Sequence, residues 1–411
     1  ATLMPTSGAY NGAVNLGDFA DIIVTNKGVL GVNRDTTVNL GAANLRFAGR
    51  DSSFLAIRGT DNTTFPNPYL ITNFTLLVDT NVSVTGDWTV TAQGRISQSA
   101  SREGAASYSA TAGYPFQGPL TLSINGNLTV ESNGLVSVQG TGYRCSDGPA
   151  YATPSGTRAA GHGGQGGSSD ATTVGKTYGS VTNPAASGSG GFWGGDNSGE
   201  GGGAMRLAVS GTTTVNGEIR ATALYDDAGA GGSIRLRTGY LEGSGVIDAS
   251  GYSVAGGSGR GGGGGRIALY LADSSSLGAV DLRAWGGAST FNGAAGTIYI
   301  ETPGGRPGQG DVWIDNGGRG ATTNMVTELP PSSGAFPDDL MYATLRVQDG
   351  AILRLTADLM AHDIQLGSGT ALYLNGRTLT LWQMAPHGFQ GTTNGPGRIV
   401  WINAGMMLKI R

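Results

Sequence analysis

Apolar and polar residues alternate in short runs along most of the chain. Alternation of this kind puts every second side chain on one face, as in a half-buried β-strand. Asn-Gly, Asp-Gly and Ser-Gly pairs, which favour tight turns, separate the runs. Windows with apolar residues at helical spacing are nearly absent. The pattern therefore predicts an all-β fold, with its clearest strands within residues 20–32, 36–49, 73–97, 120–140, 233–241, 297–301, 345–359 and 370–382.

Four of these segments repeat one arrangement, a glycine cluster followed by a strand. They read GGGAMRLAV, GAGGSIRLR, GGGGGRIALYL and GAAGTIYIE. Their first apolar strand residues are Met205, Ile234, Ile267 and Ile298, which follow one another at nearly equal intervals. A period of roughly 30 with short strands is typical of a repeat architecture.

A second apolar position recurs inside each unit. Ile219, Ile247 and Val280 follow one another at a similar interval, and Val136 stands in the same pattern earlier in the chain. Leucine-rich and propeller signatures are missing, so we expect a parallel β-helix, or solenoid, in its right-handed form. In such a fold the inward residues stack into apolar ladders from one coil to the next.

The glycine clusters have two interpretations within this fold. One is that they form corners, at φ values that other residues avoid. Five consecutive glycines at 261–265 exceed what a corner needs. The other interpretation is the close approach of a second glycine-rich segment, either from residues 141–203 or from a neighbouring subunit.

The units resemble the glycine-rich β-helical modules of secreted and surface-attached bacterial proteins. The resemblance rests on the order of a glycine cluster, Ile-x-Leu, and then an apolar strand ending in Gly, and it covers roughly residues 120–300 and 340–411. Residues 353–381 are similar to coils of autotransporter adhesins and haemagglutinins. This resemblance implies a β-helix that is secreted or exposed at the cell surface, and it identifies no catalytic residue.

Three regions follow from these patterns. Residues 1–118 are expected to form an N-terminal β region, either a cap, a β-sandwich or early coils. Residues 119–302 are expected to form the glycine-rich β-helix, interrupted by a long loop insertion at 141–203. Residues 303–411 are expected to form C-terminal β coils.

Composition narrows the possible partners. Glycine supplies 74 of 411 residues, charged residues are 13% and the net charge is −4. This balance argues against nucleic acid and anionic membranes as partners, and no apolar run is long enough for membrane insertion. The single cysteine excludes an intrachain disulfide. Ala1 is interpreted as the first residue of a mature secreted chain, left after removal of a signal peptide. Asn62, Asn73, Asn81 and Asn127 match the glycosylation sequon.

Candidate catalytic residues come from a resemblance to polygalacturonase-like β-helix hydrolases. The GHGG stretch around His162 resembles the Gly-His-Gly motif of that family, and Asp226-Asp227 resemble its paired acids. The order of the two motifs is reversed here, and the partner motifs are missing. The alternative is that these aspartates form turns and that His162 lies in a loop.

Other chemistry is suggested by residue type. Arg235 and Arg237 share one strand face by their spacing of two, which predicts either an anion-binding stripe, as a polysaccharide lyase needs, or a solvated face. Asp196 and Glu200 are a candidate Ca²⁺ pair or a polar turn. No other cofactor is expected. Trp193, Trp285 and Trp382 are either sugar-stacking platforms or packing residues.

The sequence leaves three functions open. The first is an extracellular structural protein that forms or decorates a fibre, sheath or adhesin stalk by subunit stacking, with the chain itself as partner. The second is a β-helical lyase or glycoside hydrolase acting on an acidic polysaccharide. The third is a non-catalytic glycan-binding module.

Overall fold

Every element in the described part of the chain is a β-strand. The computed structural model describes residues 13–15, 21–25, 29–32, 37–39, 44–48, 54–57, 63–64, 69–72, 75–78, 81–98, 119–151, 159–169, 174–192, 199–224, 228–254, 259–273, 276–320, 325–335, 337–382 and 389–402. Before residue 69 only backbone is described. No membrane-spanning helix is found among the described residues. The expected all-β fold is confirmed.

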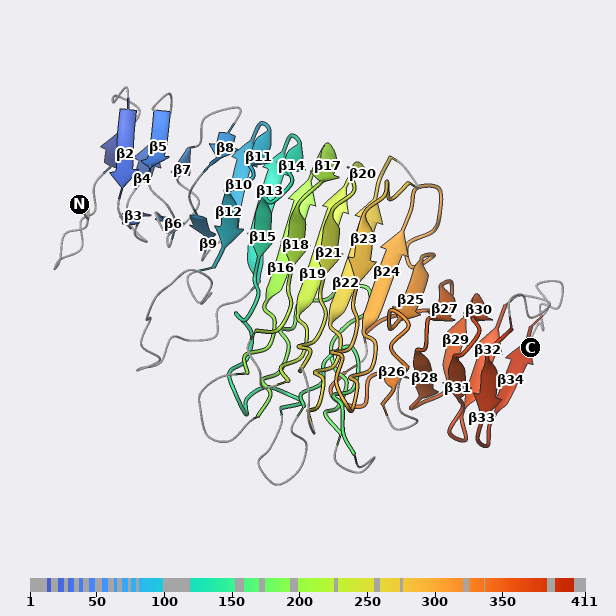
Figure 1. The fold of residues 1–411 in the computed structure, drawn as a ribbon. Helices are drawn as coiled ribbons and strands as arrows, with labels where there is room; N and C mark the ends of the chain where they lie inside the picture. Colours follow the sequence, from blue (N-terminus) through green and yellow to red (C-terminus); the bar gives the residue numbers. More distant parts are fainter. Residues whose placement is uncertain are drawn as a thin grey trace.

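Three long sheets form the body of the molecule (Figure 1). The largest has nine strands in the spatial order β10 (Asn81–Thr85), β13 (Leu120–Asn125), β16 (Ala204–Val209), β19 (Ser233–Thr238), β22 (Arg266–Leu271), β24 (Thr297–Glu301), β25 (Asp311–Asp315), β27 (Thr344–Gln348) and β30 (Asp363–Leu366). The second has eight strands, β23 (Asp281–Arg283), β21 (Val246–Asp248), β18 (Glu218–Arg220), β15 (Leu135–Ser137), β12 (Arg95–Ser97), β9 (Thr75–Val78), β6 (Phe54–Ile57) and β3 (Val29–Val32). The third has five, β20 (Tyr240–Glu242), β17 (Thr212–Val215), β14 (Leu128–Val130), β11 (Trp88–Val90) and β8 (Tyr69–Ile71).

The chain visits the three sheets in turn. Each consecutive triplet from β10–β11–β12 to β19–β20–β21 gives one strand to each sheet, and each strand pairs in parallel with its counterpart one repeat later. The pairing joins Met205 to Ile234, Ile234 to Ile267 and Ile267 to Ile298. The regular interval between these residues in the sequence is therefore the register of the sheet, as predicted.

One anchor of the second series was misplaced. Ile219 pairs with Ile247 as predicted, but Ile247 pairs with Leu282, not with Val280. The two candidates are next-but-one neighbours and so lie on the same side of a strand, which is why alternation alone does not separate them. Val280 precedes β23 and is buried against the same core.

The N-terminal strands continue the same stack. β3, β6 and β9 pair in parallel and belong to the eight-stranded sheet. Two small parallel sheets lie beside them, made of β1 (Ala13–Asn15), β4 (Thr37–Asn39) and β7 (Thr63–Thr64), and of β2 (Asp21–Thr25) and β5 (Asn44–Ala48). Parallel pairing of this kind fits the expected early coils and differs from a β-sandwich, whose strands are antiparallel.

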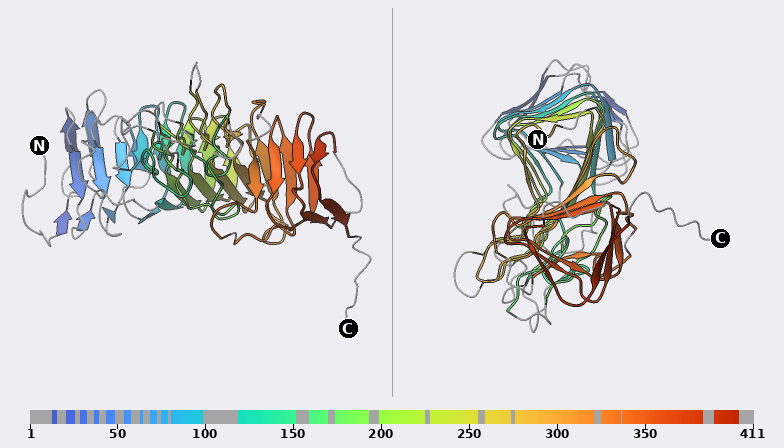
Figure 2. Two further views of the ribbon diagram at one scale, coloured as in Figure 1. Left: turned by 90° about the horizontal axis from the view of Figure 1, so that it is seen from below. Right: turned by 90° about the vertical axis from the view of Figure 1, so that its right-hand side faces the viewer.

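The chain reverses once, between β24 and β25, which pair antiparallel. Beyond that point pairing is parallel again, and two further sheets accompany β27 and β30 (Figure 2). They consist of β26 (Thr327–Leu329), β28 (Ile352–Leu355), β31 (Ala371–Tyr373) and β33 (Thr392–Asn394), and of β29 (Leu359–Ala361), β32 (Thr378–Leu381) and β34 (Arg398–Trp401).

The structure has two separate apolar cores, one enclosed by the three long sheets and one mainly among the C-terminal strands. The first fills the space between the three long sheets with aligned ladders, one of which runs Val82, Leu122, Leu207, Leu236, Leu269 and Ile300. The second core lies among the C-terminal strands and includes Val181 from the insertion. Each ladder removes whole columns of aliphatic side chains from water, at about 25 cal/mol per Å² of apolar surface.

The glycine clusters form a second packed layer beside the strands, visible as strand-free chain in Figure 1. We call it the glycine bundle. It comprises the segments that enter the nine-stranded sheet (200–203, 229–232, 261–265 and 293–296), segments that leave the eight-stranded sheet (221–224, 249–252 and 284–287), and two parts of the insertion (159–167 and 186–190).

Residues 261–265 show how the bundle is built. Successive members face three different neighbours in turn: Gly262 and Gly265 face segment 229–232, Gly261 and Gly264 face segment 284–287, and Gly263 faces Gly164. A threefold repeat without hydrogen bonds inside the segment is that of a polyproline II helix. Their amides donate outward instead, for example from Gly263 N–H to the Ala160 carbonyl at 2.9 Å.

Close approach is the reason for glycine here. A Cβ on Gly263 lies 2.0 Å from the Gly164 carbonyl oxygen, and one on Gly262 lies 1.9 Å from that of Gly229. None of residues 261–265 has a positive φ. The corner interpretation is therefore wrong for this cluster, and the predicted approach of a glycine-rich segment from 141–203 is confirmed.

The insertion contains no named strand within its described residues, as predicted, yet it is packed and not solvated. Residues 159–167 are buried throughout. Their backbone reaches the C-terminal unit as well, because Gln165 N–H donates to the Val326 carbonyl at 3.2 Å. The insertion thus forms part of the glycine bundle and also contacts the C-terminal unit.

Candidate functional site

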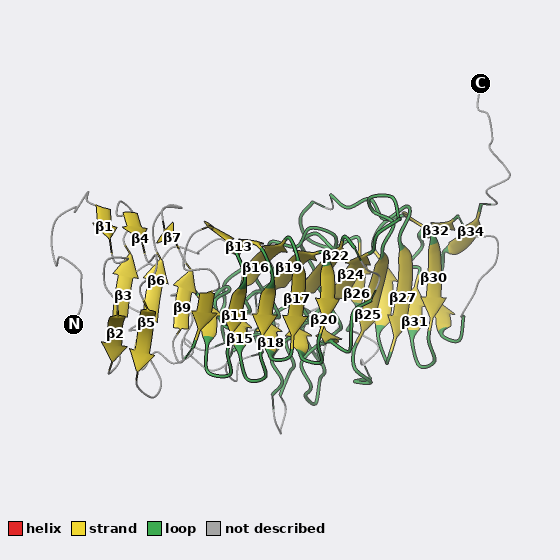
Figure 3. Cartoon of the chain, turned by 90° about the horizontal axis from the view of Figure 1, so that it is seen from above, coloured by secondary structure: helices red, strands yellow, loops and turns green. Residues whose placement is uncertain are grey.

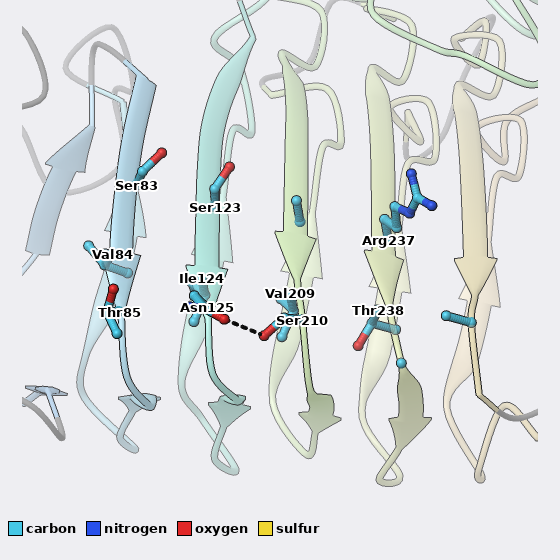
Figure 4. A pocket seen from close by; sticks show the side chains of 13 residues that line it. Ser83, Val84, Thr85, Ser123, Ile124, Asn125, Val209, Ser210, Arg237 and Thr238 are labelled. Carbon is cyan, nitrogen blue, oxygen red and sulfur yellow. Dashed lines mark hydrogen bonds between the residues drawn. The ribbon is translucent and has the colours of Figure 1, made fainter.

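A shallow groove lies on the outer face of the nine-stranded sheet (Figure 4). It crosses β10, β13, β16 and β19 near their ends and has a volume of about 470 Å³. Its lining comprises Ser83, Val84, Thr85, Ser123, Ile124, Asn125, Ala208, Val209, Ser210, Arg237, Thr238, Gly239 and Ala272. No carboxylate belongs to this lining.

Strand register explains the shape of the groove. Ser83, Ser123, Ala208 and Arg237 are Cα partners on four neighbouring strands, so they form one row along the stack. Each occupies an outward position between two buried residues. The first three side chains are small, which leaves the sheet surface low there. Arg237 stands at the end of the row and extends above it (Figure 4).

The polar groups of the groove are available to a ligand in different degrees. The hydroxyls of Ser83 and Ser123 make no hydrogen bond among the described residues. Ser210 Oγ instead donates to Asn125 Oδ1 at 3.1 Å, and Thr238 Oγ1 donates to backbone carbonyls. The groove therefore offers free hydroxyls beside a guanidinium.

Two more arginines flank this row on the same face. Arg206 and Arg235 are direct Cα partners on β16 and β19, and both are half-buried. Arg235 also lies over the ring of Tyr270, 5.2 Å from its centre. None of the ion pairs between described residues involves Arg206, Arg235 or Arg237. These three arginines, which we call the arginine triad, gather positive charge on this face.

Arg206 was not among the residues singled out from the sequence. Its signal was present, because alignment of the units GGGAMRLAV and GAGGSIRLR puts Arg206 opposite Arg235. The predicted pair Arg235 and Arg237 does share one face, as the spacing of two requires. The sheet thus extends a stripe on one strand into a cluster on two strands.

His162 lies far from solvent, inside the insertion. Its side chain is fully buried, its Nδ1 lies 2.7 Å from the Gly231 carbonyl oxygen, and its ring packs on Tyr178 at 4.5 Å. Because a carbonyl only accepts, Nδ1 carries the proton. Burial, and secondarily the charge of Arg266, lowers the pKa of His162 to about 3. A neutral, enclosed imidazole of this kind does not contact a polymer in solution.

Arg266 is the buried cation beside this histidine. It has no exposed surface, and it donates through Nε to the Tyr178 carbonyl at 2.9 Å and through Nη1 to Thr297 Oγ1 at 2.8 Å. Burial lowers its pKa to about 10, against the opposing charge of Asp338, so it remains a cation at neutral pH. Polar contacts thus tie the insertion to the segment before β19 through His162 and to β22 through Arg266.

Several predicted site residues lie outside the described residues. Asp226, Asp227, Asp196 and Trp193 belong to this group. Glu200 of the proposed Ca²⁺ pair is described and is 4% exposed, within the glycine bundle. Among the described residues, no cluster of three or more His, Cys, Asp or Glu side chains is arranged to hold a metal ion.

The predicted sugar platforms are already occupied or partly enclosed. The guanidinium carbons of Arg283 and Arg319 each lie 4.9 Å from the ring centre of Trp285. Trp382 is half-buried after β32, and His362 is exposed beside β30. Trp285 therefore has its packing partners within the protein, as the alternative interpretation of that residue held.

Comparison of the chain with models of protein families, with curated proteins and with solved structures found no match. The chemistry of the site must therefore be argued from its own geometry. That geometry combines an open, shallow surface with hydroxyls and three arginines. Such a surface is suited to holding an anionic chain. Among the described residues, no acid–base pair lines it.

Proposed function

We propose that this chain is an extracellular structural protein, a right-handed parallel β-helix that forms or decorates a fibre, sheath or adhesin stalk by subunit stacking. The observation that carries the proposal is the stack of strands along one axis, parallel except between β24 and β25, with β1 and β34 at opposite ends (Figure 3). At about 4.8 Å per strand, nine strands alone extend roughly 40 Å.

The ends of the stack support association between copies. Within the described chain, β30, β33 and β34 each pair with another strand on one side only. An edge strand offers unpaired N–H and C=O groups to a further strand. Contact between the C-terminal edge of one chain and the N-terminal edge of another is head to tail, so it propagates instead of closing.

Electron microscopy of the purified full chain over a range of concentrations tests this proposal. We expect rods that join end to end into filaments as the concentration rises. Single rods of one length at every concentration would contradict subunit stacking. Compact particles without a long axis would contradict the β-helix itself.

The enzymatic alternative, a lyase or hydrolase of acidic polysaccharides, keeps Asp226 and Asp227 as its candidate acids. It has less support, because the described partner of that motif, His162, is enclosed and neutral. Incubation of the full chain with polygalacturonate, followed by chromatography of the products, decides this point. Shortened chains would favour the enzyme, and substitution of Asp226 by Asn would then have to abolish the cleavage.

A further inference from the structure

The outer groove of the nine-stranded sheet combines three properties that a purely structural role does not require. It is hollowed, it carries arginines, and the hydroxyls of Ser83 and Ser123 make no hydrogen bond among the described residues. We infer that this groove and the arginine triad bind an acidic polysaccharide non-catalytically, with the sugar chain lying along the axis of the stack.

Charge argues for an anionic ligand. The three arginines lie on two adjacent strands: Arg206 and Arg235 are direct Cα partners on strands about 4.8 Å apart, and Arg237 follows Arg235 by two residues, about 7 Å of backbone, along β19. Like charges placed directly opposite in a sheet are unfavourable. A carboxylate or sulfate on the ligand relieves this repulsion and accepts paired N–H bonds from the planar guanidinium forks.

Shape and hydroxyl chemistry argue for a sugar chain. The row Ser83, Ser123, Ala208 forms a low track that runs across the strands and ends at Arg237. A ligand on this track meets a new strand about every 4.8 Å, which is close to the length of one pyranose residue. The free hydroxyls of Ser83 and Ser123 are donors and acceptors for sugar hydroxyls.

The charge around the groove is not uniform, and this asymmetry predicts how an anionic ligand is placed in it. Asp273 lies near Gly239, at the rim just past the end of β19 and two residues beyond Arg237, because a Cβ built on Gly239 would be 2.5 Å from Asp273 Oδ2. Its carboxylate repels an anionic chain at that rim. The acidic groups of the ligand are therefore expected to lie toward Arg237, Arg235 and Arg206.

Nucleic acid is the competing polyanion. The chain has a net charge of −4 and no basic run, so the long-range field that draws in nucleic acid is weak. The groove lining also contains no aromatic ring on which a base stacks. A short local cluster beside free hydroxyls fits a sparsely charged sugar chain better.

Binding of labelled oligomers to the full chain tests the inference. The probes are oligogalacturonate, a sulfated heparin oligosaccharide, neutral dextran and single-stranded poly-dT. We expect one of the two acidic sugars to bind at low salt, and which of the two binds tells whether carboxylate or sulfate is the recognised group. Dextran and poly-dT are expected to bind at least tenfold more weakly. Equal binding of poly-dT, or no binding of either acidic sugar, would overturn the inference.

Variants locate the site. Arg237→Gln is expected to weaken binding of the acidic sugar roughly tenfold, since a charge-assisted contact contributes about one factor of ten. Asp273→Asn, which removes the repelling charge, is expected to strengthen it. The control is Arg220→Gln on β18, whose guanidinium already pairs with Glu218 at 3.1 Å. If Arg220→Gln weakened binding as much as Arg237→Gln, the groove would not be the site.

Filament formation is measured separately, so failure of one proposal does not imply failure of the other.

Discussion

At the scale of single residues, the buried pair His162 and Arg266 shows how this weakly charged chain uses its few ionisable groups. Both side chains are fully enclosed, and both make hydrogen bonds to backbone carbonyls of other segments. The free energy of such contacts depends on protonation, because burial opposes charge on the imidazole. His162 is thus a structural group that stays neutral in the folded chain down to about pH 3.

The pH dependence of stability follows from the sign of this shift. The pKa of His162 is about 3 in the folded chain against 6.5 for an unperturbed histidine. Between those values the unfolded chain binds a proton that the folded chain does not. Stability is therefore expected to fall by about 1.4 kcal/mol per pH unit from pH 6.5 down to pH 3, with no effect of this group above pH 6.5.

Urea unfolding at pH 7, 5 and 4 measures this slope. His162→Gln has no titrating ring, so the difference between wild type and variant isolates the histidine from other acids. His362→Gln at an exposed position is the matched control and is expected to keep the wild-type slope. Equal slopes for wild type and His162→Gln would contradict the assignment.

At the scale of elements, the glycine bundle is as ordered a part of the molecule as the strands. Its segments continue the register of the strands that follow them, since a Cβ on Gly232 would contact Gly203 and one on Gly265 would contact Gly232. The bundle satisfies buried backbone groups between segments, as a sheet does. Side chains are excluded because they would separate the backbones that make these bonds.

Substitution of a bundle glycine by alanine tests this packing. Gly263→Ala places a Cβ 2.0 Å from the backbone oxygen of Gly164, which no rotamer relieves. We expect a loss of about 3 kcal/mol in the free energy of unfolding. Gly320→Ala is the control, because its Cβ meets no atom of the described residues within 4 Å and its φ is not positive. That variant is expected to stay within about 0.5 kcal/mol of wild type; a similar loss in both would refute close packing as the cause.

At the scale of the whole molecule, the insertion connects the two cores. Thr177 Oγ1 donates to Glu328 Oε2 at 2.7 Å, and Glu328 pairs with Arg354 of β28 at 2.5 Å. Asp338 accepts bonds from Ser180 Oγ and the amides of Val181 and Thr182. The C-terminal unit is therefore attached to the first stack through polar contacts as well as through β24 and β25.

Removal of Arg354 tests the strength of this connection. Glu328 is 3% exposed in its side chain, so Arg354→Met leaves a buried carboxylate with only a hydroxyl partner. We expect a loss of about 3 kcal/mol in thermal or urea unfolding. In the control Arg220→Met, the partner Glu218 is 51% exposed, and the expected loss is below about 1 kcal/mol. Equal effects would show that burial of Glu328 does not matter for stability.

The sequence alone determined the parallel strand stack and most of its register. Alternation and a regular repeat length are local signals, because every coil meets a nearly identical neighbour at the same offset. Met205, Ile234, Ile267 and Ile298 pair as that repeat required. Arg235 and Arg237 were placed on one face by the same reasoning. The prediction for Val280 was wrong because alternate positions of a strand lie on the same face, so an alternating pattern does not distinguish between them.

Only the tertiary structure decided how the glycine clusters and the insertion are used. Residues 141–203 carry no periodic apolar pattern, so no local rule places them, and some of their partners, such as Val326 for Gln165, lie far away in the chain. The five glycines at 261–265 are explained by backbones that approach from three sides. The groove arises in the same way, from small and charged residues that only the pairing of four strands brings into one surface.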